Sequence, residues 1–224
     1  MARGLLARGE RVVVASRLAY ANAAQALGCP GECVDARDFA QVEALLARHA
    51  PVTVLVCAAG SILIRPAHLT SEADFLALLD TNLKTAFACV RAAARHMTGG
   101  GSVVLFSSVA AQVGLPHHEA IAAAKGGVEA LMRSAAASHA ARGLRFNAIA
   151  PALVETGLAE KLIAKPAMRA ASEAMIPLGR LGQPGEIAQA ALWLLGAEAT
   201  WMTGQVLCLD GGMSALRTPA RTSA

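Results

Sequence analysis

A serine and a lysine near the middle of the chain have types and spacing that could support chemistry. Ser108 follows an apolar run, and Lys125 closes the segment SSVAAQVGLPHHEAIAAAK. A serine hydroxyl can hydrogen-bond a substrate carbonyl, and a lysine amine can bind hydroxyl groups or anions. One helical turn before Lys125 stands Ile121, which cannot donate a proton, and the single tyrosine, Tyr20, lies far away in the sequence. Structural roles stay open, because Ser108 could satisfy its own turn and Lys125 could be a surface residue.

Five segments in order carry a family resemblance. They are residues 52–60 (VTVLVCAAG), 80–83 (DTNL), 108–125, 147–156 (NAIAPALVET) and 178–212, which ends in TGQVLCLDGG. Ser108 and Lys125 match the Ser and Tyr-x-x-x-Lys signature of the short-chain dehydrogenases/reductases, with Ile121 at the tyrosine position. The sequence therefore resembles this family over nearly its whole length, and most of all its 3-oxoacyl-ACP reductase-like members.

Short β-branched runs alternate with longer Ala-rich amphipathic stretches, which is typical of βαβ units around a parallel sheet. Strands are predicted at residues 11–15, 32–34, 52–56, 102–106, 145–149 and 205–209, and helices at 38–48, 71–96, 119–141 and 184–195. The expected fold is one α/β domain over residues 1–224, a Rossmann-type doubly wound parallel sheet in three α/β/α layers. Residues from about 214 to 224 are expected to form a flexible tail.

The beginning of the chain departs from the family pattern. MARGLLARGERVVVASR resembles the first helix and the second strand, so the family's first strand and Gly-rich turn are missing, and Gly9 is expected to cap the helix. Without that central strand, its neighbours would stand about 10 Å apart or pair directly. A start codon assigned too late and an authentic short form compete as explanations. Unpaired backbone groups in a core favour the late start codon.

The resemblance implies three catalytic residues. Ser108 would hydrogen-bond the substrate carbonyl, Lys125 would hold the nicotinamide ribose, and Asn82 would anchor a proton-relay water. Asn82 could also be an ordinary polar break in a long helix. His117 and His118 precede Ile121 by one turn, so an imidazole could replace the missing proton donor if the helix already begins there. A polar loop is the alternative for this pair.

The resemblance also implies a set of cofactor-binding residues. An arginine suits a 2′-phosphate, so Arg17, after the second strand, favours NADP(H) over NAD(H). Asp35 would bond the adenine amino group, or else be a turn aspartate. The remaining cofactor positions are Ala59, Gly60, Lys125, Pro151, Val154 and Thr156. Ala152 replaces the glycine of the family's Pro-Gly loop, and the apolar residues between 157 and 181 match its substrate lid.

Composition excludes several other classes. The net charge of +4 comes from scattered arginines, which does not indicate nucleic-acid binding. The mean hydropathy of +0.46 is high, but no apolar run reaches the roughly 20 residues that span a bilayer, and a secretory signal is not apparent. Five cysteines are interpreted as buried reduced thiols rather than metal ligands. A cytoplasmic protein without membrane, metal or nucleic-acid partners is expected.

Two functions remain open. One is an NADP(H)-dependent oxidoreductase acting on a carbonyl or alcohol group of an apolar or acyl-type substrate, with impaired activity because of Ile121. The other is a non-catalytic relative that acts through cofactor binding or assembly. Small residues along the two long helices predict a homo-oligomer, with a tetramer expected.

Overall fold

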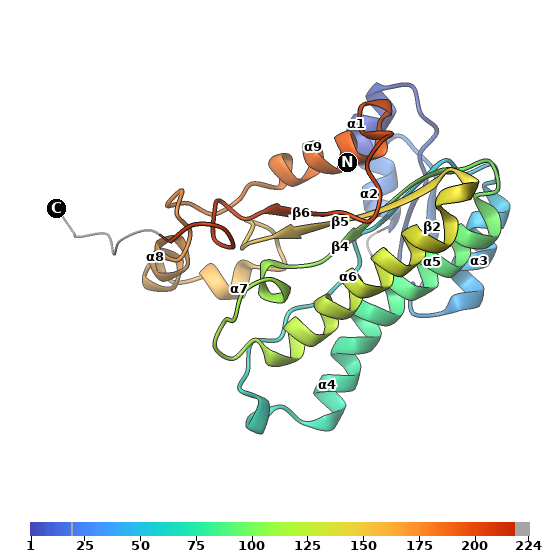
Figure 1. Ribbon diagram of the computed structural model, residues 1–224. Coiled ribbons are helices and arrows are strands. Elements are labelled where there is room, and N and C mark those ends of the chain that lie inside the picture. Colours follow the sequence, from blue (N-terminus) through green and yellow to red (C-terminus); the bar gives the residue numbers. More distant parts are fainter. Residues whose placement is uncertain (19, 218–224) are drawn as a thin grey trace.

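Parallel strands form the middle layer of the protein (Figure 1). The computed structural model describes residues 1–18 and 20–217. Within them the strands are β1 (Val14–Ser16), β2 (Gly31–Cys33), β3 (Val54–Cys57), β4 (Gly101–Phe106), β5 (Leu144–Pro151) and β6 (Val206–Leu209). All of the pairings between these strands are parallel. The predicted α/β fold of the Rossmann type is confirmed.

The strands are divided between two sheets. One sheet pairs β1 with β2, and the other has the order β3-β4-β5-β6. In the described part of the chain β1 and β3 do not pair with each other, so the missing strand does not lead to direct pairing of its neighbours. The first strand is also shorter than predicted, because its pairing begins only where Val14 lies opposite Gly31.

Helices cover both faces of the sheets. They are α1 (Ala2–Ala7), α2 (Tyr20–Leu27), α3 (Phe39–Arg48), α4 (Glu72–Leu79), α5 (Thr85–His96), α6 (Glu119–His139), α7 (Glu160–Ile163), α8 (Pro166–Ala174) and α9 (Pro184–Leu195). In Figure 1, α5 and α6 lie on one face of the β4-β5 region and α9 lies on the other. Among these described helices, none combines the length and the apolar character needed to cross a bilayer.

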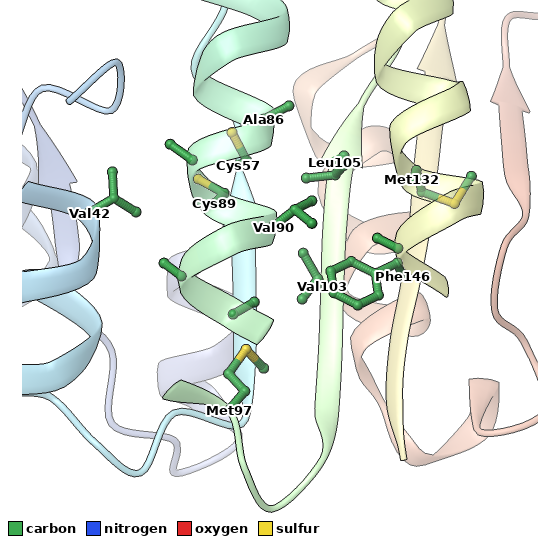
Figure 2. Close-up of a cluster of buried hydrophobic side chains, with 14 of the residues drawn as sticks. Val42, Cys57, Ala86, Cys89, Val90, Met97, Val103, Leu105, Met132 and Phe146 are labelled. Atoms are coloured by element: carbon green, nitrogen blue, oxygen red, sulfur yellow. The ribbon is translucent and has the colours of Figure 1, made fainter. Parts of the chain in front are cut away.

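The larger core lies between the sheet and the α3-α5-α6 face. Figure 2 shows Val103 and Leu105 of β4 pointing toward Val90 of α5, while Phe146 of β5 lies beside Met132 of α6. The smaller core packs Leu5 of α1 and residues of α9 against the opposite face. Alanine is the commonest buried residue type in both of these long helices.

The cysteines correct one part of the prediction. Cys57 and Cys89 are buried together in the larger core, as expected (Figure 2). Cys33 and Cys208 are exposed and Cys29 is half-buried, and all five are free thiols. Cys33 and Cys208 lie on β2 and β6, which are the outer strands of their sheets, where less of the chain covers the side chains.

Gly9 caps the first helix, as predicted. Gly9 has a φ of +80°. Its N–H donates to the Leu6 carbonyl, and the Glu10 N–H donates to the Leu5 carbonyl. This is the Schellman pattern that a glycine makes possible at the end of a helix.

The predicted flexible tail lies partly outside the described residues, which end at 217. In the described part, Ala215 and Leu216 donate backbone hydrogen bonds to the Gly212 carbonyl.

Candidate active site

Asn82 lies in a widened turn of the helix that the sequence predicts as continuous from residue 71 to 96. A π-helical segment, Asp80–Lys84, separates α4 from α5. The buried Asn82 amide donates to the Leu78 carbonyl at 2.9 Å, and its Oδ1 accepts from the Ser61 backbone N–H at 3.3 Å. Such π segments occur often at functional sites. Asn82 therefore fixes the turn after β3 rather than simply interrupting a helix.

Lys125 is buried, which excludes the surface-lysine alternative. Its residue is only 8% exposed, and its Nζ donates to the Phe106 carbonyl at the end of β4 at 2.9 Å. Desolvation by burial lowers the pKa of Lys125 to about 8. The amine is therefore close to its titration range at physiological pH.

Gly60 lies next to both Asn82 and Lys125. A Cβ placed on Gly60 would lie 3.0 Å from Asn82 Oδ1 and 3.4 Å from Lys125 Nζ. The predicted residues Gly60, Asn82 and Lys125 thus form one cluster at the carboxyl end of β3. Ligands of open parallel sheets bind outside these strand ends.

Ser108 lies two residues beyond the end of β4. Its Oγ accepts from the Ala110 N–H at 3.2 Å and caps a short 3₁₀ turn, Val109–Ala111. The residue stays half-buried, and an accepting hydroxyl can still donate its own proton. Ser108 therefore satisfies its own turn and can also hydrogen-bond a ligand.

Glu129 of α6 is a buried carboxylate that was not predicted from the sequence, and it hydrogen-bonds to the residue that follows β4. Ser107 Oγ donates to Glu129 Oε1 at 2.7 Å and lies 3.3 Å from the Lys125 carbonyl oxygen. The Gln112 side chain also donates to Glu129. Glu129 stands four positions after Lys125 on an apolar helix and therefore lies one turn further along the same face. This spacing was the signal in the sequence that could have identified it.

Ile121 occupies an apolar environment. Its side chain is 4% exposed and packs in a cluster with Leu78, Ala110 and Ala120. Leu63, Phe75 and Leu115 are partly buried against the same cluster. The position at which the family resemblance places a proton donor is thus part of a small hydrophobic core.

The histidines do not share a helical face with Ile121. Helix α6 begins at Glu119, with His118 as its N-terminal cap position, so the helix on which this prediction depended does not extend far enough. His117 is exposed and has a φ of +66°. One ring nitrogen of His118 lies 2.7 Å from the Pro116 carbonyl oxygen. The polar-loop interpretation describes this pair.

Arg17 and Asp35 follow the two strands of the smaller sheet. Arg17 is exposed directly after β1. Asp35 forms an ion pair with Arg37, whose Nη2 lies 2.6 Å from Asp35 Oδ2. Hydrogen bonds from Arg37 lower the pKa of Asp35 to about 2, and the Arg17 charge contributes in the same direction. This local ion pair agrees with the alternative interpretation of Asp35 as a turn aspartate.

The loop after β5 provides the remaining predicted contacts. Pro151 ends β5, and Val154 forms a parallel bridge with Gly182. Thr156 is exposed, and its hydroxyl lies 3.4 Å from the Val154 carbonyl oxygen. Together with Ala59 and Gly60 after β3, these residues follow the carboxyl ends of parallel strands.

The predicted lid region contains α7 and α8. Leu158, Met168 and Met175 are exposed, whereas Ile176 and Leu181 are buried in the body of the protein. Ile176 also helps to line a cavity of about 290 Å³ near the end of β6, which the sequence did not indicate. Only part of the apolar segment is therefore available to a substrate.

Comparison with known proteins decides the family. Residues 1–214 match the family model described as enoyl-(acyl carrier protein) reductase. The chain belongs to the short-chain dehydrogenase/reductase family. It is similar to 3beta-hydroxysteroid dehydrogenase 1 of Eggerthella lenta, with 36% identity covering 87% of this chain and 74% of the relative.

Two further similarities bear on function. The inactive 2-(S)-hydroxypropyl-CoM dehydrogenase 2 of Xanthobacter autotrophicus is 34% identical, covering 96% of this chain and 100% of the relative. The crystal structure of a gluconate 5-dehydrogenase from Burkholderia cenocepacia, in complex with NADP and tartrate, superposes with a TM-score of 0.88. It is 30% identical and covers 96% of this chain and 90% of that one. The family is one of oxidoreductases.

Proposed function

We propose that the protein is an NADP(H)-dependent oxidoreductase that acts slowly on the carbonyl or alcohol group of an apolar or acyl-type substrate. The observation that carries the proposal is the cluster of Gly60, Asn82 and Lys125 at the carboxyl end of β3. Ser108 stands at the end of the adjacent strand β4. The partner is a small-molecule substrate.

Residues of this chain fit both ends of a nicotinamide cofactor. The absent Cβ of Gly60 leaves room beside Lys125 Nζ, which can donate to ribose hydroxyls. The exposed guanidinium of Arg17 suits a 2′-phosphate. Val154 and Thr156 are the proposed carboxamide contacts.

The proposed chemistry divides between the cofactor and the protein. The bound cofactor supplies a hydride for the carbonyl carbon. Ser108 donates a hydrogen bond to the carbonyl oxygen, and Lys125 orients the ribose. Ile121 supplies no proton, so a water molecule held near Asn82 has to do so. A general acid is typically worth about 10²–10⁴ in rate, which is why slow turnover is expected.

A non-catalytic relative is the second candidate. The burial of Ile121 among Leu78, Ala110 and Ala120 favours it, because apolar side chains enclose the position at which the resemblance places a proton donor. The similarity to a relative whose name marks it as inactive points in the same direction. Such a protein would act through cofactor binding or assembly.

The test restores the missing hydroxyl. Ile121→Tyr is compared with Ile121→Phe, which adds a ring of similar size without a proton donor, in assays of NADPH oxidation with ketones and acyl thioesters. NADPH binding is followed separately by fluorescence. The oxidoreductase proposal expects Ile121→Tyr to exceed both the original protein and Ile121→Phe by at least about tenfold. Unchanged absence of turnover with NADPH bound would favour the non-catalytic candidate.

Assembly and location are part of the proposal. We propose a homotetramer, because Phe87 of α5 is exposed and lines an apolar groove together with Leu83 and Leu131. The cytoplasm remains the predicted location.

A further inference from the structure

Two thiols from different elements meet in the larger core. Cys57 is the last residue of β3, and Cys89 lies on α5, which packs against that strand. Figure 2 shows the two side chains next to each other between the strand and the helix, and the thiols hydrogen-bond to each other. Two cysteines in such contact can form a disulfide after a small movement.

The surroundings of Cys57 stabilise a thiolate. Its sulfur interacts with the Cys89 thiol, with the Ala59 backbone N–H and with the charge of Lys125. The Cys89 hydrogen bond is the largest cause of a lowered pKa at Cys57, although burial acts in the opposite direction. The thiolate is the nucleophilic form of cysteine. Cys57 is therefore the member of the pair that is prepared to attack an electrophile.

The surroundings of Cys89 keep its thiol protonated. The hydrogen bond with Cys57 and burial both raise the pKa of Cys89 well above its usual range. The residue belongs to the apolar cluster that also contains Ala86, Val90 and Leu105. The two cysteines thus differ in character, as an attacking and a resolving cysteine do.

Only a small electrophile fits the position of this pair. Each of the two cysteines is 6% exposed, so a protein disulfide or another bulky reagent has no room to approach. Cys57 directly precedes Ala58 and Ala59, which are exposed. Hydrogen peroxide is only slightly larger than water and oxidises thiolates. Burial therefore selects a peroxide of minimal size.

We propose that Cys57 and Cys89 form a dithiol site that hydrogen peroxide converts to a disulfide between β3 and α5. The Cys57 sulfur attacks one peroxide oxygen, so that an S–O bond forms, the O–O bond breaks, and the leaving hydroxide takes up a proton to give water. The Cys89 sulfur then attacks the resulting sulfenic acid. An S–S bond forms, the S–O bond breaks, and the leaving hydroxide combines with the thiol proton as a second water. The two thiols lose two electrons in total, and the peroxide gains them.

The disulfide would lie beside the candidate active site. Cys57 precedes the turn that carries Gly60, and Asn82 lies in the π segment directly before α5. A covalent bond between β3 and α5 therefore joins the two parts that place Gly60 against Asn82. It also removes the thiolate charge that favours the protonated amine of Lys125. The reaction with peroxide does not depend on the proposed function.

The experiment treats the folded full chain with equimolar hydrogen peroxide, blocks the remaining thiols with N-ethylmaleimide and digests the protein with trypsin without reduction. Cleavage places Cys57 in the peptide 49–84 and Cys89 in the peptide 85–91, and neither peptide contains another cysteine. Mass spectrometry should find these two peptides joined, with the loss of two hydrogen atoms, and dithiothreitol should separate them.

Three variants assign the roles, and circular dichroism verifies that each is folded. Cys89→Ala removes the resolving thiol, so Cys57 should accumulate as a sulfenic acid that dimedone labels. Cys57→Ala should leave Cys89 reduced. Cys208→Ala is the matched control, because Cys208 is exposed on β6, and it should still give the joined peptides.

Three results would overturn the proposal. The first is oxidation of exposed cysteines while both core peptides remain separate and carry N-ethylmaleimide. The second is a linkage that forms only when urea has unfolded the chain. The third is dimedone labelling of Cys89 in Cys57→Ala with none of Cys57 in Cys89→Ala, which would reverse the two roles.

Discussion

The buried amine of Lys125 should make the stability of the protein depend on pH in a defined window. The pKa is about 8 in the folded protein, because burial disfavours the charged form, against an ordinary value of 10.5. The unfolded chain therefore binds more protons than the folded protein between pH 8 and 10.5. Stability should rise with pH through this window, and the full cost of the buried charge is present below pH 8.

The magnitude follows from the shift. Each pKa unit corresponds to 1.36 kcal/mol, so this change amounts to about 3 kcal/mol. Because Lys125 is buried, solvent screening reduces this free-energy contribution only slightly. Lys125→Met removes the titrating group and should remove this contribution. The difference in unfolding free energy between the original protein and the variant should change by about 3 kcal/mol between pH 7.5 and 10.5.

Urea unfolding followed by circular dichroism at several pH values measures this difference. Lys161→Met is the matched control, because Lys161 is exposed on α7 and its loss should leave the pH dependence unchanged. The reasoning would be refuted if the difference for Lys125→Met stayed constant within about 0.5 kcal/mol across the window, since the buried amine would then titrate as in the unfolded chain.

Three further predictions concern the cofactor, the assembly and the core. Arg17→Ala should abolish a preference for NADPH over NADH in fluorescence titrations, and an unchanged preference would place the 2′-phosphate elsewhere. Light scattering at micromolar concentration should show particles several times larger than 22.9 kDa, while a purely monomeric sample would contradict the proposed tetramer. Phe146→Ala should lower the unfolding free energy by about 3–5 kcal/mol, because the ring is fully buried between β5 and α6. A loss below about 1 kcal/mol in denaturant unfolding would mean that the core closes around the deletion.

Local patterns were sufficient to predict most elements. The helix over residues 184–195 has the predicted limits, and Gly9 ends the first helix as expected. The π segment at Asp80–Lys84 was not predictable from periodicity, because it depends on contacts between Asn82 and Ser61 from another part of the chain. The start of α6 at Glu119 was predicted correctly, and it places His117 and His118 ahead of the first residue of the helix.

The sequence alone determined the family resemblance, the α/β alternation and the absence of a tyrosine at position 121, because each depends on residue types and their spacing along the chain. Tertiary structure decided what the spacing leaves open. It buried Lys125 beside Gly60 and Asn82, enclosed Ile121 in an apolar cluster, and left β1 and β3 unpaired with each other. Burial, pKa shifts and strand pairing arise from contacts between distant segments, and a linear pattern does not contain those contacts.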